Sequence, residues 1–205
     1  MSDPARRLGV LVSGRGSNLQ ALIDAIGRGE LDATIAVVIS NVPGAGALER
    51  AASAGIETLV MPHRDWPSRE AYDAALGQAL VGRGVRLVCL AGFMRRLSAR
   101  FLEVFSGPVL NVHPSLLPAF PGLDAAGQAI AHGVKVAGCT VHLVTPELDA
   151  GPIVLQAAVP VEPDDTPDAL AARILVQEHR LFPRAVSRVL AGGWRVDGRR
   201  FVEAG

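Results

Sequence analysis

One feature constrains the fold more than any other: an apolar run leads directly into a glycine-rich turn and then into a helical pattern. The run is LGVLV at residues 8–12, and the turn is SGRGSN at residues 13–18. Apolar residues then recur three or four positions apart until Gly27. Continuous short apolar runs are typical of strands buried on both faces of a parallel sheet, and the later spacing indicates a helix. The chain therefore begins as the strand, loop and helix of an α/β protein.

The same alternation continues along the chain and predicts its architecture. Further strands are expected at residues 35–39, 57–61, 86–90, 108–112, 138–144 and 153–161, and helices at 19–27, 47–54, 69–81, 98–105, near 125–132 and from Thr166 to Leu190. The last two strands are expected to pair antiparallel. Ser68 and Thr166 are the expected N-caps of the helices that follow them. We predict an α/β fold with three layers: a mostly parallel, twisted sheet, helices on both faces, and an antiparallel extension near the C-terminus. One domain is expected over residues 1–205, with a core at about 7–190 and a short hairpin tail at 194–205.

Composition excludes several classes of protein. With 20 acidic and 20 basic residues the formal net charge is zero, which argues against a nucleic-acid partner because such proteins need clustered positive charge. Cys89 and Cys139 lie in apolar runs, so we expect buried free thiols and no disulfide or metal framework. No apolar run approaches membrane-spanning length, and residues 1–7 lack the apolar segment of a signal peptide. We expect a cytoplasmic protein with no membrane partner.

The glycine-rich turn is a candidate phosphate site. Gly14 and Gly16 allow backbone N–H groups to surround an anion, and the amino end of the following helix adds favourable partial charge. The alternative is an ordinary tight turn in which Ser17 is the helix N-cap. Leu19 stands where a dinucleotide-binding turn has its third glycine, and no acidic residue ends the second strand. A monophosphate is therefore favoured over NAD.

A second candidate site lies at the carboxyl end of the strand at 108–112. Asn111 and His113 alternate with Val112, so their side chains are expected on the same side, offering an amide donor and an imidazole to one point. Prolines 114, 118 and 121 prevent regular structure from continuing. The pair is suited to stabilising an oxyanion. The alternative is a capping Asn with a His that only completes its own hydrogen bonds.

A third strand end, at residues 91–97, carries an apolar loop. Phe93, Met94 and Leu97 could form the wall of a pocket for a flat aromatic ligand, because open α/β sheets bind ligands at the carboxyl ends of their strands. The alternative is that this loop only covers the core.

Five motifs, in order, resemble the phosphoribosylglycinamide formyltransferases, folate-dependent enzymes of purine biosynthesis. They are GRGSN at 14–18, AGFMR at 91–95, NVHPSLLP at 111–118, ELDAGP at 147–152 and QEH at 177–179. The third and fourth are shared by formyl-folate transferases generally, whereas the first and fifth specify this branch. The resemblance covers residues 7–190.

The resemblance implies a Rossmann-like formyltransferase fold and a reaction. The formyl group of 10-formyltetrahydrofolate, a cosubstrate, would pass to the amine of N1-(5-phosphoribosyl)glycinamide in de novo purine biosynthesis, with no metal required. The partners would be these small molecules, and the protein would be a monomer or homodimer. The alternatives are a formyltetrahydrofolate hydrolase or a formyltransferase for another amine. The hydrolase normally has an extra amino-terminal domain and the methionyl-tRNA enzyme an extra basic carboxyl-terminal domain, and we expect neither at this length.

The resemblance also implies roles for individual residues. Catalysis would fall to Asn111, His113 and Asp149. Substrate would be bound by Gly14, Arg15, Gly16, Ser17 and Asn18 at the phosphate, by Glu178 at the ribose and by Pro114 near the glycinamide. The folate would contact Arg69 at its glutamate tail and Met94, Arg95, Arg96, Leu97, Asn111, Val144, Glu147, Leu148 and Asp149 around the pterin. The Leu117–Pro118 bond would be cis.

The chain departs from the family pattern in one loop. Many relatives carry a histidine shortly after the Pro-Gly of this region, but here residues 123–128 read LDAAGQ. The absence of an imidazole puts in doubt any role of this loop in substrate closure or proton transfer.

Overall fold

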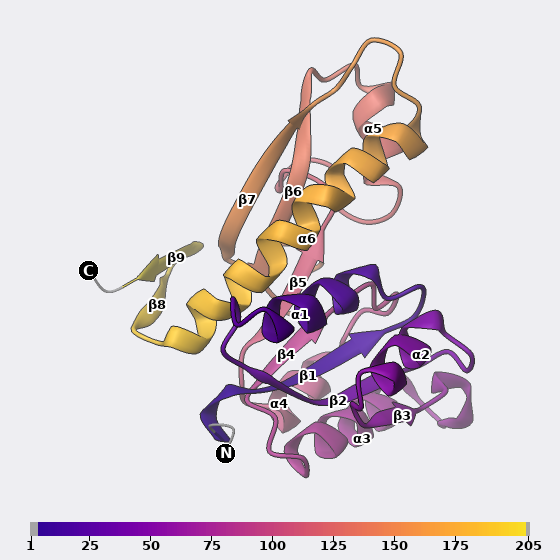
Figure 1. Ribbon diagram of the computed structural model, residues 1–205, viewed down its shortest axis with the longest axis vertical. Coiled ribbons are helices and arrows are strands. Elements are labelled where there is room, and N and C mark those ends of the chain that lie inside the picture. The colour runs from indigo at the N-terminus through magenta and orange to yellow at the C-terminus, as the bar shows by residue number, and fades with distance from the viewer. Residues whose placement is uncertain (1–3, 204–205) are drawn as a thin grey trace. The chain divides into compact units, whose positions relative to one another are not determined.

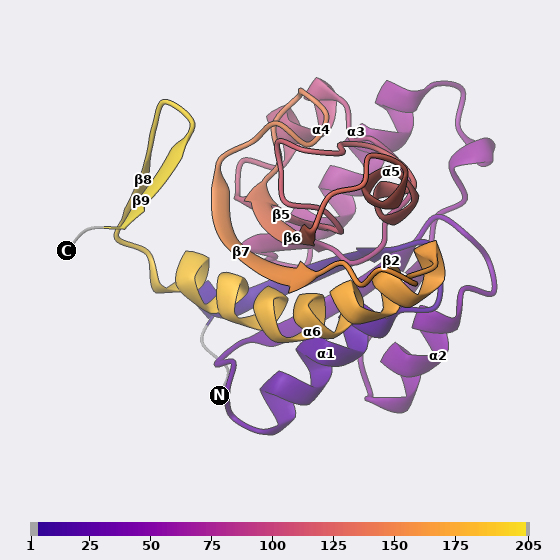
Figure 2. The same ribbon diagram turned by 90° about the horizontal axis from the view of Figure 1, so that it is seen from above.

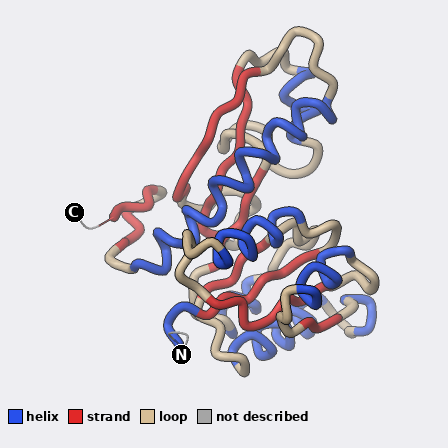
Figure 3. The backbone as a smooth tube through the Cα atoms, viewed as in Figure 1, coloured by secondary structure: helices blue, strands red, loops and turns tan. Residues whose placement is uncertain are grey.

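The computed structural model of the protein describes residues 4–203, so the last two residues of the predicted tail lie outside the described residues. The chain packs into two compact units, Met1–Leu110 and Asn111–Gly205, called here the N-terminal and C-terminal units. The expectation of one domain over the whole chain stays a prediction. Figure 3 shows the alternation of helices and strands that the sequence pattern indicates.

The N-terminal unit is built on a parallel sheet with the strand order β3-β2-β1-β4. Its strands are β1 (Arg7–Val12), β2 (Thr34–Ser40), β3 (Thr58–Val60) and β4 (Leu87–Leu90), and its helices are α1 (Ser17–Gly27), α2 (Gly46–Ser53), α3 (Arg69–Val81) and α4 (Ala99–Val104), with 3-10 turns η1 (Pro4–Arg6) and η2 (His63–Asp65). Figures 1 and 2 show α1 and α2 on one face of this sheet and α3 and α4 on the other. The predicted covering of both faces is confirmed.

The C-terminal unit supplies the antiparallel extension that the sequence predicts. Its strands are β5 (Val109–His113), which starts at the end of the first unit, β6 (Val136–Leu143), β7 (Ile153–Pro160), β8 (Trp194–Asp197) and β9 (Arg200–Glu203), and its helices are α5 (Ala125–Ala131) and α6 (Pro167–Ala191). β6 pairs antiparallel with β7, and β8 with β9. α6 packs along β6 and β7 and also contacts α5 (Figure 1). The mixed, mostly parallel α/β fold class is confirmed.

Local chemistry explains where these elements begin. The side chains of Leu8, Val10, Leu11 and Val12 are fully buried, as a two-sided core strand requires. Ser68 caps α3 by accepting the N–H of Ala71 at 3.1 Å, and Thr166 caps α6 by accepting the N–H of Ala169 at 3.2 Å. Both caps were predicted from sequence and are confirmed.

Some boundaries differ from the prediction. β3 has three residues where five were expected, and β6 begins at Val136, two residues early, because Val136 pairs with Pro160 on β7. Pairing with a partner strand extends β6 in a way that no local pattern shows. Within residues 4–203, no helix has the length and apolar character needed to cross a membrane.

Candidate active site

The expected catalytic residues His113 and Asp149 meet in the C-terminal unit. His113 is the last residue of β5, and Asp149 lies in the loop between β6 and β7. The Nδ1 atom of His113 lies 3.5 Å from the Oδ2 atom of Asp149, and both side chains are less than 10% exposed, at 6% and 9%. A carboxylate this close to an imidazole can orient the ring and offset positive charge that develops on it during a reaction. The arrangement suits charge stabilisation and proton transfer at one point.

Asn111 joins this cluster through a residue that sequence reasoning missed. Its Nδ2 atom lies 3.2 Å from Nε2 of His142, and that ring nitrogen lies 3.7 Å from Oδ1 of Asp149. The polar cluster therefore consists of Asn111, His142, Asp149 and His113. In the sequence, the only signal for His142 is that it is an imidazole in a strand whose other residues are apolar apart from Thr140. Within residues 4–203, no group of three or more His, Cys, Asp or Glu side chains is arranged to hold a metal ion.

Burial sets the charge of His142. Its side chain is 3% exposed, and this burial lowers the pKa of the imidazole below its ordinary value. The hydrogen bond to the Leu143 carbonyl and the charge of Asp149 both raise the pKa, but burial is the larger effect, and His113 adds to the lowering. The His142 ring is therefore neutral at neutral pH.

The other ring nitrogen of His113 is also engaged. Its Nε2 atom lies 2.9 Å from the backbone carbonyl of Phe120. A carbonyl only accepts, so Nε2 carries the proton and donates it. The same turn reaches Asp149, whose Oδ2 accepts the N–H of Gly122 at 2.9 Å. For His113 to donate to a substrate oxygen from Nε2, it must exchange the Phe120 carbonyl for that oxygen.

The loops around the cluster contain an unusual backbone conformation. Among the described residues, the non-glycine positions with positive φ are Phe120 at 52°, Asp124 at 53° and Asp149 at 48°. Asp tolerates this left-handed region better than most residues, whereas Phe adopts it at a cost. Such conformations concentrate at functional sites, where surrounding contacts hold them in place. Of the three, Asp149 belongs to the polar cluster, and Phe120 contacts the cluster through the bond from His113 to its carbonyl.

The segment after His113 is fixed by a buried threonine. The hydroxyl of Thr140 on β6 accepts the N–H of Leu117 at 3.0 Å and donates to the carbonyl of Ser115 at 2.7 Å. Gln156 on β7 donates to the carbonyl of Leu117, also at 3.0 Å. The Leu117–Pro118 bond is cis, as the family resemblance implied. These contacts hold the backbone that follows the catalytic strand.

The glycine loop lies in the N-terminal unit, at the start of α1. The N-cap of α1 is Gly16, with φ 78°, and no side chain caps the helix. The alternative in which Ser17 is the N-cap is wrong, because Ser17 already adopts helical geometry as the first residue of α1. The N-terminal N–H groups of α1 therefore have no side-chain cap, as an anion site requires.

The amino end of α2 holds the glycine loop in place. The N–H of Ala47 donates to the carbonyl of Gly14 at 3.1 Å. A Cβ atom on Gly16 would lie 2.6 Å from the Cβ of Ala47, closer than carbon atoms approach, whereas a Cβ on Gly14 would meet nothing within 4 Å. Position 16 thus requires glycine for two reasons: its left-handed backbone conformation, and the lack of space for a side chain beside α2.

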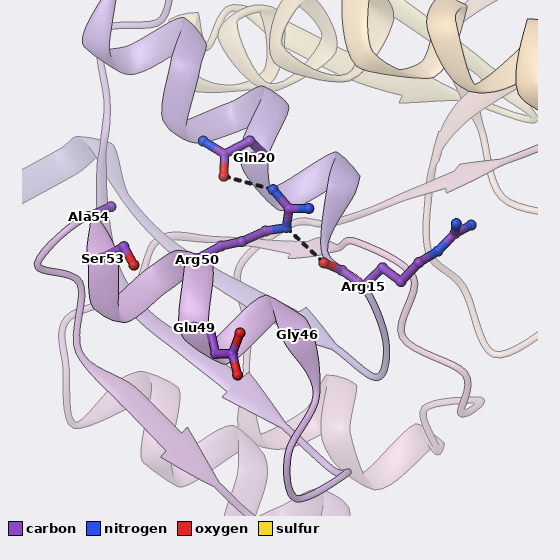
Figure 4. A pocket seen from close by; sticks show the side chains of 7 residues that line it. All are labelled: Arg15, Gln20, Gly46, Glu49, Arg50, Ser53 and Ala54. Atoms are coloured by element: carbon purple, nitrogen blue, oxygen red, sulfur yellow. Dashed lines mark hydrogen bonds between the residues drawn. The ribbon is translucent and has the colours of Figure 1, made fainter.

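A shallow pocket lies beside this loop (Figure 4). It has a volume of about 600 Å³ and is lined by Arg15, Gln20, Gly46, Glu49, Arg50, Ser53 and Ala54. The guanidinium of Arg50 donates to the carbonyl of Arg15 at 2.9 Å and to the side chain of Gln20 at 3.2 Å. The side chain of Arg15 extends away from Arg50 (Figure 4). Arg50 thus stabilises the backbone of the loop.

The residues of the loop after β4, which are expected around the pterin, differ in how far they are exposed. Phe93 and Leu97 are 8% and 4% exposed, so most of their side-chain surface packs against the core. Met94 is 67% exposed and can contact a ligand. The hydroxyl of Ser13, at the end of β1, accepts the N–H of Met94 at 2.9 Å and fixes its position. Arg95 is half-buried, with its guanidinium 5.2 Å from the centre of the Tyr72 ring.

The remaining expected ligand contacts are dispersed through the two units. Arg69 lies 3.9 Å from the buried carboxylate of Asp73 at the start of α3, and Arg96 is exposed. Glu147 and Leu148 are exposed in the loop that carries Asp149, whereas Val144 and Pro114 are half-buried. Glu178 is buried in α6, at 6% exposure. Asn18 is buried in the first turn of α1.

Comparison with known proteins agrees with the motifs. The formyl transferase family matches residues 6–186. The chain is 46% identical over 190 residues to phosphoribosylglycinamide formyltransferase of Escherichia coli, a match covering 93% of this chain and 87% of that protein. It is 50% identical to the trifunctional purine biosynthetic protein adenosine-3 of Drosophila melanogaster, over 94% of this chain but only 14% of that longer protein. The crystal structure of glycinamide ribonucleotide transformylase 1 from Symbiobacterium toebii is 52% identical, with a TM-score of 0.95 over 97% of this chain and 94% of that one.

Proposed function

The chain belongs to the formyl transferase family, and from this membership we propose that it transfers the formyl group of 10-formyltetrahydrofolate to the amine of phosphoribosylglycinamide in de novo purine biosynthesis. One observation carries the proposal: Asn111, His113 and Asp149, which the motifs single out, belong to one polar cluster in the C-terminal unit. The identity to the Escherichia coli enzyme over most of its length supports the same choice of substrates. The products are the formylated glycinamide ribonucleotide and tetrahydrofolate.

The cluster supplies the groups that this reaction needs. The glycinamide nitrogen attacks the formyl carbon, and the carbonyl oxygen becomes an oxyanion. Asn111 donates an amide N–H to that oxygen, and the imidazolium of His113 offsets its charge. The bond from the formyl carbon to N10 of the folate then breaks. The proton lost by the attacking nitrogen passes to N10 through a water held by Asp149.

The other expected residues hold the two substrates. The phosphate is bound by the loop of Gly14, Arg15, Gly16, Ser17 and Asn18, the ribose by Glu178 and the glycinamide by Pro114. The folate is bound by Arg69, Met94, Arg95, Arg96, Leu97, Val144, Glu147 and Leu148, together with Asn111 and Asp149. The exposed side chains of Met94 and Leu148 supply apolar surface for the pterin. We assign the protein to the cytoplasm, with small molecules as its partners, as a monomer or homodimer that needs no metal.

The test of this function is dependence on the acceptor. Purified protein should release tetrahydrofolate rapidly only when phosphoribosylglycinamide is present, because the bound amine outcompetes water in a site closed to solvent. The assay follows folate product by absorbance with and without that acceptor. Equal rates in both reactions would identify a hydrolase, and transfer to other primary amines at a similar rate would identify a different acceptor.

The glycine loop gives a second prediction, with a matched control at the other end of the helix that follows it. Gly16→Ala should raise the KM for phosphoribosylglycinamide roughly tenfold or more, because left-handed φ and the contact with Ala47 both disfavour a side chain there. Gly27→Ala, at the far end of α1 and outside the phosphate loop, should leave that KM within about twofold, since its Cβ meets nothing within 4 Å. Steady-state kinetics with each substrate varied in turn, on variants whose thermal unfolding is also recorded, makes the comparison. Equal changes in both KM values would contradict a phosphate role for this loop.

A further inference from the structure

We propose that His142 is a positioning residue that fixes the orientation of the Asn111 amide for catalysis. The inference rests on the proposed function, because the purpose of that orientation is to stabilise the oxyanion of formyl transfer. It assigns a role to a buried side chain that none of the five motifs contains.

The hydrogen bonds of His142 determine which way the amide of Asn111 points. Nδ1 of His142 lies 3.0 Å from the carbonyl of Leu143, which can only accept, so Nδ1 carries a proton. In a neutral ring, Nε2 then has a lone pair and no proton. The side chain 3.2 Å away, Asn111, must therefore present its NH2 group and not its oxygen.

This orientation has a direct catalytic consequence. One N–H of Asn111 is used by His142, and the second N–H of the same nitrogen points away from the ring, where it can donate to an oxyanion. If the amide rotated by 180°, its oxygen would face the lone pair of Nε2, and the donor would leave its position. Donors held in advance at the place where charge develops stabilise a transition state far more than mobile ones. His142 thus confines Asn111 to the useful one of two orientations.

The neutrality of His142 is part of this arrangement. The charged or titratable groups that face its ring are Asp149, 3.7 Å away, and His113, which acts on it electrostatically. Burial lowers the pKa of His142 and outweighs the opposite effect of Asp149, so Nε2 stays an acceptor near neutral pH. Protonation would turn Nε2 into a donor and require the oxygen of Asn111 instead.

Two substitutions separate this role from a structural one. His142→Gln can place an amide oxygen near the position of Nε2 and so keep the acceptor for Asn111. His142→Asn can place its NH2 near the position of Nδ1 and so keep the bond to Leu143 while losing the acceptor. We expect His142→Asn to lower kcat roughly 10- to 100-fold, less than complete loss of an oxyanion donor, with KM values nearly unchanged. His142→Gln should recover most of that loss.

A double-mutant cycle and an NMR measurement complete the test. In the Asn111→Ala background, His142→Asn should change kcat by less than about twofold, because residues that act as one unit are not additive. Independently of activity, the 15N chemical shifts of protein labelled with 15N-histidine should show that His142 is protonated at Nδ1 and unprotonated at Nε2 at pH 7. The Nε2 resonance should shift in Asn111→Ala.

Each outcome bears on the proposal in a defined way. A ring protonated at Nε2 at pH 7, fully additive kcat effects, or better activity in His142→Asn than in His142→Gln would each overturn the positioning role. The NMR result is obtained on the unmodified protein, so a variant that folds poorly does not remove the test. Failure of the proposed function would instead appear as absence of formyl transfer in the unmodified protein, with the NMR result unaffected.

Discussion

Replacing Asp149 with asparagine is expected to lower the turnover number by roughly two to four powers of ten, the range typical of general acid and base groups. The carboxylate lies 3.5 Å from Nδ1 of His113 and is almost fully buried, so its charge acts on the imidazole with little solvent screening. Asparagine keeps the size of the side chain and tolerates φ of 48°, the angle at this position. The loss would therefore reflect charge and proton transfer, with small effects on the KM values.

A matched control for Asp149 exists in the same unit. Asp124 also has positive φ, at 53°, and its carboxylate caps α5 by accepting the N–H of Gly127. Asn is an equally good cap, so Asp124→Asn should retain full turnover. Steady-state kinetics over a range of pH compares the two variants with the unmodified protein. Near-native turnover in Asp149→Asn would reduce this carboxylate to the role of a loop residue that binds Gly122.

The second large effect is expected at Asn111. Asn111→Ala should lower kcat by roughly 10²- to 10³-fold, as removal of one oxyanion donor does in other acyl-transfer sites. The KM values should change little, because the donor contacts the oxygen most strongly when it is charged. The measurement is kcat and KM for both substrates, together with the urea midpoint of unfolding to confirm an intact fold.

A second substitution at Asn111 distinguishes catalysis from capping. Asp caps strand and helix ends as well as Asn does, but its carboxylate cannot donate a hydrogen bond and would repel both an oxyanion and the lone pair of His142. Asn111→Asp should therefore be at least as inactive as Asn111→Ala. An active Asp variant would restore the simpler interpretation of Asn111 as a cap at the end of β5.

Local patterns predicted those parts of the fold that depend on local chemistry. The buried run of β1, the glycine turn before α1 and the caps at Ser68 and Thr166 follow from backbone sterics and short-range hydrogen bonds. The limits of β6 and the shortness of β3 depend on pairing with distant strands. A short segment of sequence carries no information on which distant strand it will pair with, so these limits could not be predicted.

In the candidate site, too, residue types could be predicted from the sequence, whereas contacts between distant residues could not. The motifs pointed to Asn111, His113 and Asp149, whereas His142 was missed because its partner Asn111 lies 31 residues away in the chain. The bond from His113 to the carbonyl of Phe120 was equally hidden, since it involves a backbone atom that no residue type reveals. Side-chain chemistry can be recognised in a sequence, but backbone acceptors and their geometry are set by the tertiary fold.

The neutral state of His142 also affects how the fold tolerates acid. Burial lowers the pKa of this imidazole in the folded chain, whereas in the unfolded chain it titrates near its ordinary value of about 6.5. Between these two values the unfolded chain binds more protons, so the free energy of unfolding decreases as the pH falls from about 6.5 through the lowered folded value. Each pH unit in that window removes up to about 1.4 kcal/mol. The imidazole that keeps an amide correctly oriented at neutral pH therefore makes the folded chain less stable in mild acid.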